Sequence, residues 1–295
     1  MKKSKVYFIR EITPESLIKI YEKLDIELNG NVCVKISTGE LGGHNYLKPD
    51  LIGPLVKKLN GTIIECNTAY PLQRYETSDH LKVAEEHGFT AIAPVDIMDS
   101  EGEKEIPVSS GKHLDVDIVG THMDNYDSML NLAHFKGHAM AGFGGALKNQ
   151  SIGVASRNGK AYIHSAGKSR DSKELGVVEP LQEDFLESMA EAAKAVSDYF
   201  KENGKKIIHI NVMNNLSIDC DCDPDPNDPC MKDIGILASK DPVALDQACI
   251  DLIWSSDDRG RAHFIERVER QNGRYILPYA EEIGLGSRKY ELIEI

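Results

Sequence analysis

The sequence has 295 residues, of which 41% are hydrophobic and 27% are charged, values typical of a globular protein with a large apolar core. The 47 Asp and Glu residues outnumber the 34 Lys and Arg residues, and the net charge of −13 argues against binding to nucleic acids or to anionic membrane surfaces. No apolar run reaches the ~18 residues of a membrane span, and the N-terminus lacks the apolar stretch of a secretion signal, so we expect a cytoplasmic protein.

The first third of the chain alternates patterns of strand and helix. Strands are predicted at residues 6–9, 31–36, 62–66 and 89–95, and helices at residues 14–24, 49–59 and 77–88. Thr13, Pro14 and Glu15 favour the start of the first helix, because they suit the cap, the first turn and the helix dipole respectively. Thr77 or Ser78 is predicted to cap the third helix. This alternation predicts a parallel sheet with right-handed crossovers.

After the first third of the chain, the pattern changes. Residues 96–128 contain short strands joined by a glycine turn, which predicts an antiparallel excursion or a smaller lobe. Residues 154–171 are predicted to form a solvated basic loop, with a lid over the site as the alternative. Further strands are expected at residues 129–134, 206–213, 233–238 and 290–295, and helices at residues 183–203, 242–254, 262–269 and 279–283. The predicted fold is a single α/β domain of residues 1–295, with a mainly parallel sheet, flanking helices and a smaller antiparallel excursion.

The most unusual stretch of the sequence is MLNLAHFKGHAMAGFGGALKNQSIG. On a continuing strand, the side chains of His134, Lys136 and His138 would share one face. Imidazole can ligate a metal ion or transfer a proton, and lysine can hold a carboxylate or phosphate. Lys148 and Asn149 follow glycines that let backbone N–H groups approach an anion. We predict a site for an anion, a metal ion or both; structural histidines and solvated lysines are the alternative.

Three cysteines lie close together in the acidic segment DCDCDPDPNDPC. Thiolates bind soft or borderline metals such as iron or zinc, and a bound cation would offset acidic neighbours that raise thiol pKa values. We predict Cys220 and Cys222 as metal ligands, with Cys230, His134 and His138 as additional candidates. Cys66, at the end of a predicted strand, could join them. Calcium binding by the aspartates and a surface loop with unused thiols are the alternatives.

Polar loops follow several of the predicted strands, and ligands of open α/β sheets bind beyond the carboxyl ends of strands. The candidates for ligand binding on the early loops are Ser37, Thr38, Asn67 and Arg74, and His80 is a candidate acid or base. Asn214 and residues 239–241 also follow predicted strands, so we expect these loops to meet along one edge of the sheet. Loops that merely turn the chain are the alternative reading.

Four segments of the sequence resemble the domain-of-unknown-function 362 family, whose members are often labelled iron–sulfur centre proteins. They are ECNTAYPLQRYETSDHLKVAEEHGF, NLAHFKGHAMAGFGGALKNQSIG, DCDCDPDPNDPC and DIGILASKDPVALDQA, and the resemblance covers roughly residues 30–255. It implies a shared α/β fold and a site that involves Lys136, His138, Lys148 and Asn149. Many relatives carry an inserted motif, C-x-x-C-x-x-C-x-x-x-C-P, that holds a 4Fe–4S cluster. The sequence lacks this motif, so we do not expect the usual ferredoxin-type cluster.

Three hypotheses follow from these patterns. The first is a metal-binding protein, like an iron–sulfur centre, whose thiolate, histidine and lysine side chains form one site at the carboxyl edge of the sheet. There Lys136 and Lys148 would neutralise a small anionic ligand, which Asn149 would orient. The second is an enzyme acting on a small carboxylate or phosphate, with His138 or His80 as the acid or base. The third is a non-catalytic redox or interaction protein. The sequence predicts no particular substrate and no oligomeric state.

Overall fold

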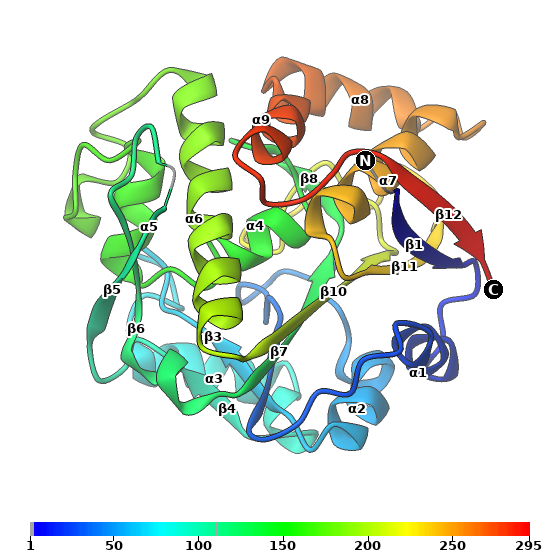
Figure 1. Ribbon diagram of the computed structural model, residues 1–295, viewed down its shortest axis with the longest axis horizontal. Coiled ribbons are helices and arrows are strands. Elements are labelled where there is room, and N and C mark those ends of the chain that lie inside the picture. The colour runs from blue at the N-terminus through cyan, green and yellow to red at the C-terminus, as the bar shows by residue number, and fades with distance from the viewer. Residues whose placement is uncertain (1–2, 110) are drawn as a thin grey trace.

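An eight-stranded sheet forms the centre of the computed structural model, which describes residues 3–109 and 111–295 (Figure 1). In order across the sheet, the strands are β12 (Tyr290–Glu294), β1 (Ser4–Ile9), β11 (Gly235–Ser239), β10 (Lys206–Met213), β7 (Ser128–His134), β2 (Val32–Lys35), β3 (Thr62–Glu65) and β4 (Val95–Ile97). Neighbouring strands pair in parallel except at β11, which is antiparallel to both β1 and β10. The mainly parallel sheet predicted from the sequence is confirmed.

Helices cover both faces of this sheet. The helices of the described chain are α1 (Pro14–Lys23), α2 (Pro49–Lys58), α3 (Thr77–Glu86), α4 (Ala146–Gln150), α5 (Arg157–His164), α6 (Gln182–Glu202), α7 (Pro242–Ser255), α8 (Arg261–Arg270) and α9 (Ile276–Glu282). Figure 1 shows α1 and α2 on one face and α4, α6 and α7 on the other. On the first face, Leu130 and Leu132 of β7 belong to one apolar cluster with Leu17 of α1 and Ile52 of α2. This burial of aliphatic side chains holds the two helices to the sheet.

The opposite face of the central strands carries buried polar side chains. Asn131 donates from Nδ2 to the carbonyl oxygen of Ala146, at 2.9 Å, and also faces Nδ1 of His209, at 3.1 Å. Burial lowers the pKa of His209 to about 3, so its ring is neutral and Nδ1 can accept. Asn211 donates to Asp246 at 2.7 Å. Because buried polar groups are costly without partners, these hydrogen bonds fix α4 in position over the sheet.

The predicted strand at residues 89–95 is wrong except at its last residue. Phe89–Ala91 forms a short 3₁₀ turn, and β4 begins only at Val95. Gly88, at φ +85°, precedes this turn in the left-handed conformation that glycine adopts without strain. The turn directs the buried ring of Phe89 toward Tyr46, with 5.8 Å between the ring centroids. Tertiary packing of one aromatic side chain therefore displaces the local preference for a strand.

The predicted cap of α3 is also wrong. Glu76 occupies the N-cap position, without a side-chain cap, and Thr77 and Ser78 are the first helical residues. The Thr77 hydroxyl instead accepts a hydrogen bond from Nδ2 of Asn67, at 2.8 Å. The Thr77 hydroxyl therefore bonds to Asn67, from the loop before α3, instead of capping the helix.

The segment of residues 154–171 is not the solvated loop predicted from its charges. It contains α5, which Ser156 caps by accepting the N–H of Gly159 at 3.1 Å. Lys160 on this helix is buried, with 7% of its surface exposed. The run of basic residues therefore includes a side chain that faces the interior.

Two small antiparallel sheets accompany the main one. β5 (Glu103–Pro107) pairs with β6 (Val116–Gly120), which confirms the predicted excursion, and β8 (Lys136–His138) pairs with β9 (Gly142–Gly144). The main strand β7 therefore ends at His134 instead of continuing through His138. None of the described helices has the length and apolar content needed to cross a membrane.

The reversed direction of β11 corrects one expectation about the sheet edge. Residues 239–241 follow β11, so they lie at the edge opposite to the carboxyl ends of β2, β3 and β7. Asp241 there caps α7, accepting the N–H groups of Val243 and Ala244 at 3.0 Å each. These residues support the fold and do not join the loops at the other edge.

Candidate functional site

A cavity of about 240 Å³ lies at the carboxyl ends of β2, β3 and β7. It is lined by residues from all the loops expected at this edge, apart from the displaced segment after β11. The residues predicted from the sequence that line it are Ser37, Cys66, Arg74, His134, Lys136, His138, Lys148, Asn149, Cys220 and Cys222. The structure thus gathers in one cavity side chains that lie up to 185 positions apart, from Ser37 to Cys222.

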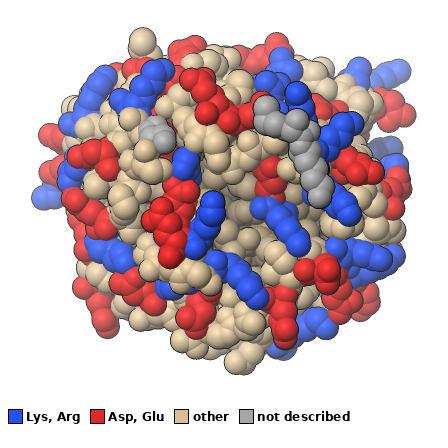
Figure 2. Space-filling view, viewed as in Figure 1, with Lys and Arg blue, Asp and Glu red and all other residues tan. Residues whose placement is uncertain are grey.

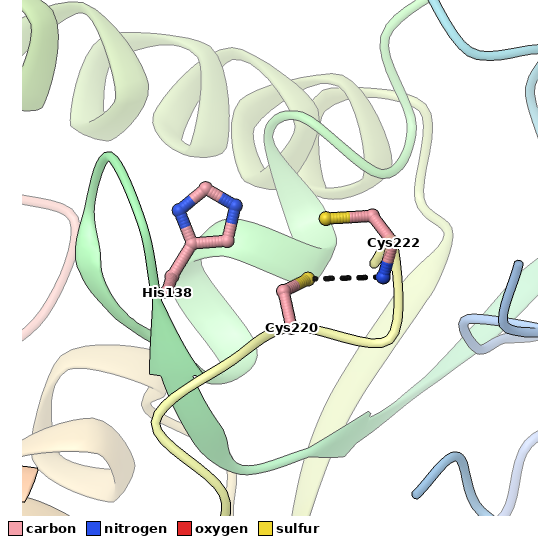
Figure 3. Close-up of side chains that lie close together, drawn as sticks. All are labelled: His138, Cys220 and Cys222. Atoms are coloured by element: carbon pink, nitrogen blue, oxygen red, sulfur yellow. Dashed lines mark hydrogen bonds between the residues drawn. The ribbon is translucent and has the colours of Figure 1, made fainter. Parts of the chain in front are cut away.

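The two thiols of the acidic segment lie at the cavity wall beside His138 (Figure 3). One ligand atom from each of Cys220, Cys222 and His138 lies within 4.8 Å of the other two. Figure 3 shows that β8 carries the imidazole and that the loop after β10 carries both sulfurs. The backbone N–H of Cys222 faces Sγ of Cys220 at 3.5 Å. This arrangement can hold a metal ion or support thiol chemistry.

The hydrogen bonds of His138 assign its tautomer. Nδ1 accepts the backbone N–H groups of Met140 and Ala141, at 3.1 and 3.0 Å. Burial, followed by the charge of Lys148, lowers the pKa of His138, so the ring is neutral and its proton lies on Nε2. In Figure 3 the edge of the ring that bears Nε2 is directed toward the sulfurs. His138 can therefore donate a hydrogen bond to a thiolate.

The two thiols titrate as a pair. A hydrogen bond from the Cys222 thiol, helped by Lys148 and His138 and opposed by burial, holds the pKa of Cys220 well below its usual value. The same hydrogen bond raises the pKa of Cys222. The first proton therefore leaves Cys220, and a metal ion would have to displace the second one from Cys222.

Asp221, between the two cysteines, attaches this loop to the sheet. Its Oδ1 lies 2.8 Å from Nδ1 of His134, and its Oδ2 lies 2.6 Å from Nζ of Lys136. Nε2 of His134 also faces an acceptor, the carbonyl oxygen of Asn214, at 2.7 Å. Because both ring nitrogens of His134 are engaged with oxygen atoms, His134 is placed to anchor the loop and not to bind metal. The positive charge of Lys136 is likewise matched by Asp221.

The deeper wall of the cavity contains an ion-pair network around Glu65. The Glu65 carboxylate lies 3.1 Å from Nζ of Lys35 and 3.3 Å from Nη1 of Arg74. Thr38 donates both its backbone N–H and its hydroxyl to Glu65, at 2.7 and 3.0 Å. Burial opposes ionisation of Glu65, but Lys35 and Arg74 hold its pKa below the usual range. Thr38, predicted as a ligand-binding residue, therefore supports this network and does not line the cavity.

Helix α4 presents Lys148 and Asn149 to the cavity. Asp246 of α7 accepts the backbone N–H groups of Ala146 and Leu147, at 2.8 and 2.9 Å, and so holds the start of α4. Asn149 donates from Nδ2 to Asn131 at 2.7 Å. The NH₂ group of Asn149 is thus hydrogen-bonded to the sheet, whereas Lys148 lines the cavity.

Three other predicted residues lie outside the cavity. His80 is fully buried, and Nδ1 faces Asn67 at 3.3 Å. Burial lowers the pKa of His80 to about 3, so it is a poor acid or base near neutral pH. Asn67 is held by Thr77 and by His80. Cys230 donates its thiol to the carbonyl oxygen of Leu216, at 3.3 Å, and is not part of the group formed by Cys220, Cys222 and His138.

Among the acidic and basic residues of the cavity wall, sequence reasoning did not predict Lys35, Glu65, Lys160 and His164 as part of the site. A signal for the first two was present, because a charged residue inside an apolar strand segment, as in VCVKI and TIIEC, has to find a buried partner. Lys160 and His164 are four residues apart and share one face of α5, a pattern that was visible only once this segment was known to be helical.

The cysteine positions do not fit a cluster held by four thiolates. All six cysteines lie in the described ranges, and among them Cys66, Cys220 and Cys222 line the cavity. The Cys66 thiol donates to the carbonyl oxygen of Val154, at 3.2 Å, and burial raises its pKa. The remaining cysteines lie elsewhere in the fold. The donor set present here fits a single ion better than a four-cysteine cluster.

Comparisons with known proteins give one family match. The family described as "Domain of unknown function (DUF362)" matches residues 32–251. No curated protein matches the chain. Two similar solved structures are the lactate racemase apoprotein from Thermoanaerobacterium thermosaccharolyticum, at 13% identity and a TM-score of 0.43, and a protein from Thermotoga maritima, at 11% identity and a TM-score of 0.43. The matches cover 70% and 87% of this chain but only 50% and 58% of those two chains.

Proposed function

The chain belongs to the domain-of-unknown-function 362 family, and within that family we propose that it binds a thiophilic metal ion through Cys220 and Cys222. The observation that carries the proposal is the group of two sulfurs and one imidazole within 4.8 Å of one another at the wall of a cavity. Thiolate ligands favour zinc or iron(II) over hard cations such as calcium. Two thiolates leave coordination positions for other ligands, and the cavity gives a small molecule access to them. We also propose a cytoplasmic location, where free thiols stay reduced.

Removing both thiols tests the proposal. Protein purified without chelator, and then titrated with Zn²⁺ or Fe²⁺, should hold about one ion per chain, and the double variant Cys220→Ser/Cys222→Ser should hold close to none, because serine is a poor ligand for either ion. Elemental analysis measures the content. Cys230→Ser is the matched control, since Cys230 lies outside the cavity, and it should keep the wild-type content. Equal metal content in the wild type and the double variant would overturn the proposal.

We propose that His138 donates a hydrogen bond to a thiolate sulfur and is not a third metal ligand. Direct ligation through Nε2 would leave Nδ1 without a proton while it faces two backbone N–H donors, which amounts to binding an imidazolate. We therefore expect His138→Ala to retain bound metal and to weaken its affinity by about 10- to 100-fold, the usual effect of losing a group that orients a ligand. Competition with a chelator measures the affinity. Complete loss of binding would instead identify His138 as a ligand.

An enzyme that uses Cys220 as a nucleophile is the second candidate. It is favoured by the position of Sγ, which faces a backbone N–H at 3.5 Å beside the imidazole of His138. The metal titration separates the two candidates, because a folded wild-type protein that takes up neither Zn²⁺ nor Fe²⁺ is expected only for the second.

A further inference from the structure

The cavity wall has more cationic side chains than carboxylates to neutralise them. Lys35, Arg74 and Lys136 each lie within 3.3 Å of a carboxylate oxygen. Lys148 and Lys160 form no ion pair with any carboxylate that the structure describes, although both line the cavity. Apart from the Cys220 thiolate beside Lys148, which a bound metal ion would engage, these two positive charges have no counterion among the described residues, although the net charge of the chain is −13.

Lys160 is the more informative of the two lysines because it is buried. Only 7% of its surface is exposed, and its ammonium group donates one hydrogen bond, to the carbonyl oxygen of Ala155 at 2.5 Å. An ammonium group has three donors. A buried charge without a counterion is destabilising, so a protein keeps one where a ligand supplies the opposite charge.

The two lysines have different neighbours in the cavity. A Cβ placed on Gly144 would lie 3.3 Å from Cδ of Lys148 and 3.7 Å from Cε of Lys136, so these two chains run side by side near the thiol loop. Lys160 instead contacts Ala155, next to the carbonyl group of Val154 that binds the Cys66 thiol. The first lysine is therefore beside the thiol pair, and the second is beside the end of β3.

The face of the molecule drawn in Figure 2 does not repeat this excess of positive charge. Lys and Arg side chains are interspersed with Asp and Glu over the face drawn in Figure 2. The cationic character is a property of the cavity, and it is suited to a ligand small enough to enter. The cavity, of about 240 Å³, has room for a small organic acid.

We infer that the cavity binds a small molecule with two anionic groups, one held by Lys148 beside the thiol pair and the other held by Lys160 near the end of β3. The inference rests on the proposed function in placing one anionic group next to Cys220 and Cys222. A dicarboxylate and a phosphorylated carboxylate share the required chemistry. His164, on the α5 turn after Lys160, stays neutral because burial, and then the charges of Lys148 and Lys160, lower its pKa to about 4, so the lysines supply the charge.

Calorimetric titration with malonate, succinate, phosphoglycolate and acetate tests the inference, on both metal-free and metal-loaded protein. At least one of the three dianionic probes should bind at least tenfold more tightly than acetate, a difference of about 1.4 kcal/mol. Lys148→Met and Lys160→Met should each weaken that probe at least tenfold, because each removes one of the two charges. Methionine keeps the side-chain length, and the loss of an unpaired buried charge should not prevent folding. Lys168→Met, at an exposed site after the end of α5, is the matched control and should stay within twofold of wild type.

Two outcomes would overturn the inference: acetate binding as tightly as every dianion, or a dianion affinity that neither lysine variant changes. Failure of all four probes to bind at about 10 mM, where a ligand worth ~3 kcal/mol would be detected, also overturns it. Metal content is measured on the same samples. Loss of anion binding with the metal retained counts against this inference alone, whereas anion binding by a protein that takes up no metal counts against the metal centre alone.

Discussion

Asp221→Asn should lower the free energy of unfolding by about 3–5 kcal/mol at neutral pH, the usual cost of removing one partner from a buried ion pair. The Asp221 carboxylate is 3% exposed and binds His134 and Lys136 at 2.8 and 2.6 Å. The variant leaves the ammonium group of Lys136 buried without its counterion. It also detaches the thiol loop from the sheet, so metal affinity should fall together with stability. Chemical denaturation of the metal-free protein isolates the first effect.

The pH dependence of this effect has a defined sign. The charges of His134 and Lys136 hold the pKa of Asp221 below its usual value, against the opposing effect of burial. Stability from the ionised carboxylate is therefore present above the usual pKa of aspartate and is lost as the pH falls through the lower value. Asp228→Asn is the matched control, because Asp228 lies in the same segment with its side chain 97% exposed, and its replacement should change stability by less than about 0.5 kcal/mol. A loss below ~1 kcal/mol for Asp221→Asn would contradict the anchoring role.

Much of the fold could be predicted because local patterns and packing agree. The alternation of strands and helices gave the parallel sheet, and Thr13 caps α1 as expected, accepting the N–H of Ser16 at 3.1 Å. The direction of β11 could not be predicted, because an apolar run has the same composition whichever way it enters a sheet. The helix around Lys160 was missed for a related reason, since charge alone does not distinguish a solvated loop from a helix whose lysine faces a cavity.

The location of the site could be predicted, but the roles of its individual residues could be predicted less well. The ends of β2 and β7 place Ser37 and His134 near one another whatever their function, and both line the cavity. Roles depend on partners that are distant in sequence. In the sequence, His134 is a candidate metal ligand. In the structure, Asp221, 87 residues away in the sequence, is bound to one of its ring nitrogens. In the sequence, His80 is a candidate acid or base. In the structure, it is completely buried in the core.

Asp117→Asn should stabilise the protein by about 4 kcal/mol at pH 8 and have almost no effect at pH 4. Asp117 lies on β6 and is completely buried, and neither carboxylate oxygen has a hydrogen-bond partner among the described residues. Burial raises its pKa from the ordinary 3.8 to about 7. At ~1.36 kcal/mol per pKa unit, the cost of ionising it in the folded state is about 4 kcal/mol. Asparagine has nearly the same shape and no charge, so it removes this cost.

The pH profile distinguishes this mechanism from a simple change in packing. Between pH 3.8 and about 7 the unfolded chain releases the Asp117 proton and the folded chain keeps it, so wild-type stability falls across this window and then levels off. The difference between Asp117→Asn and the wild type should grow over the same window. Asp257→Asn, at an exposed aspartate, is the matched control and should shift neither the stability nor its pH dependence. A constant difference at every pH would mean that the carboxyl group is already neutral, or is paired, throughout the range, and that charge burial at Asp117 does not limit the stability of this fold.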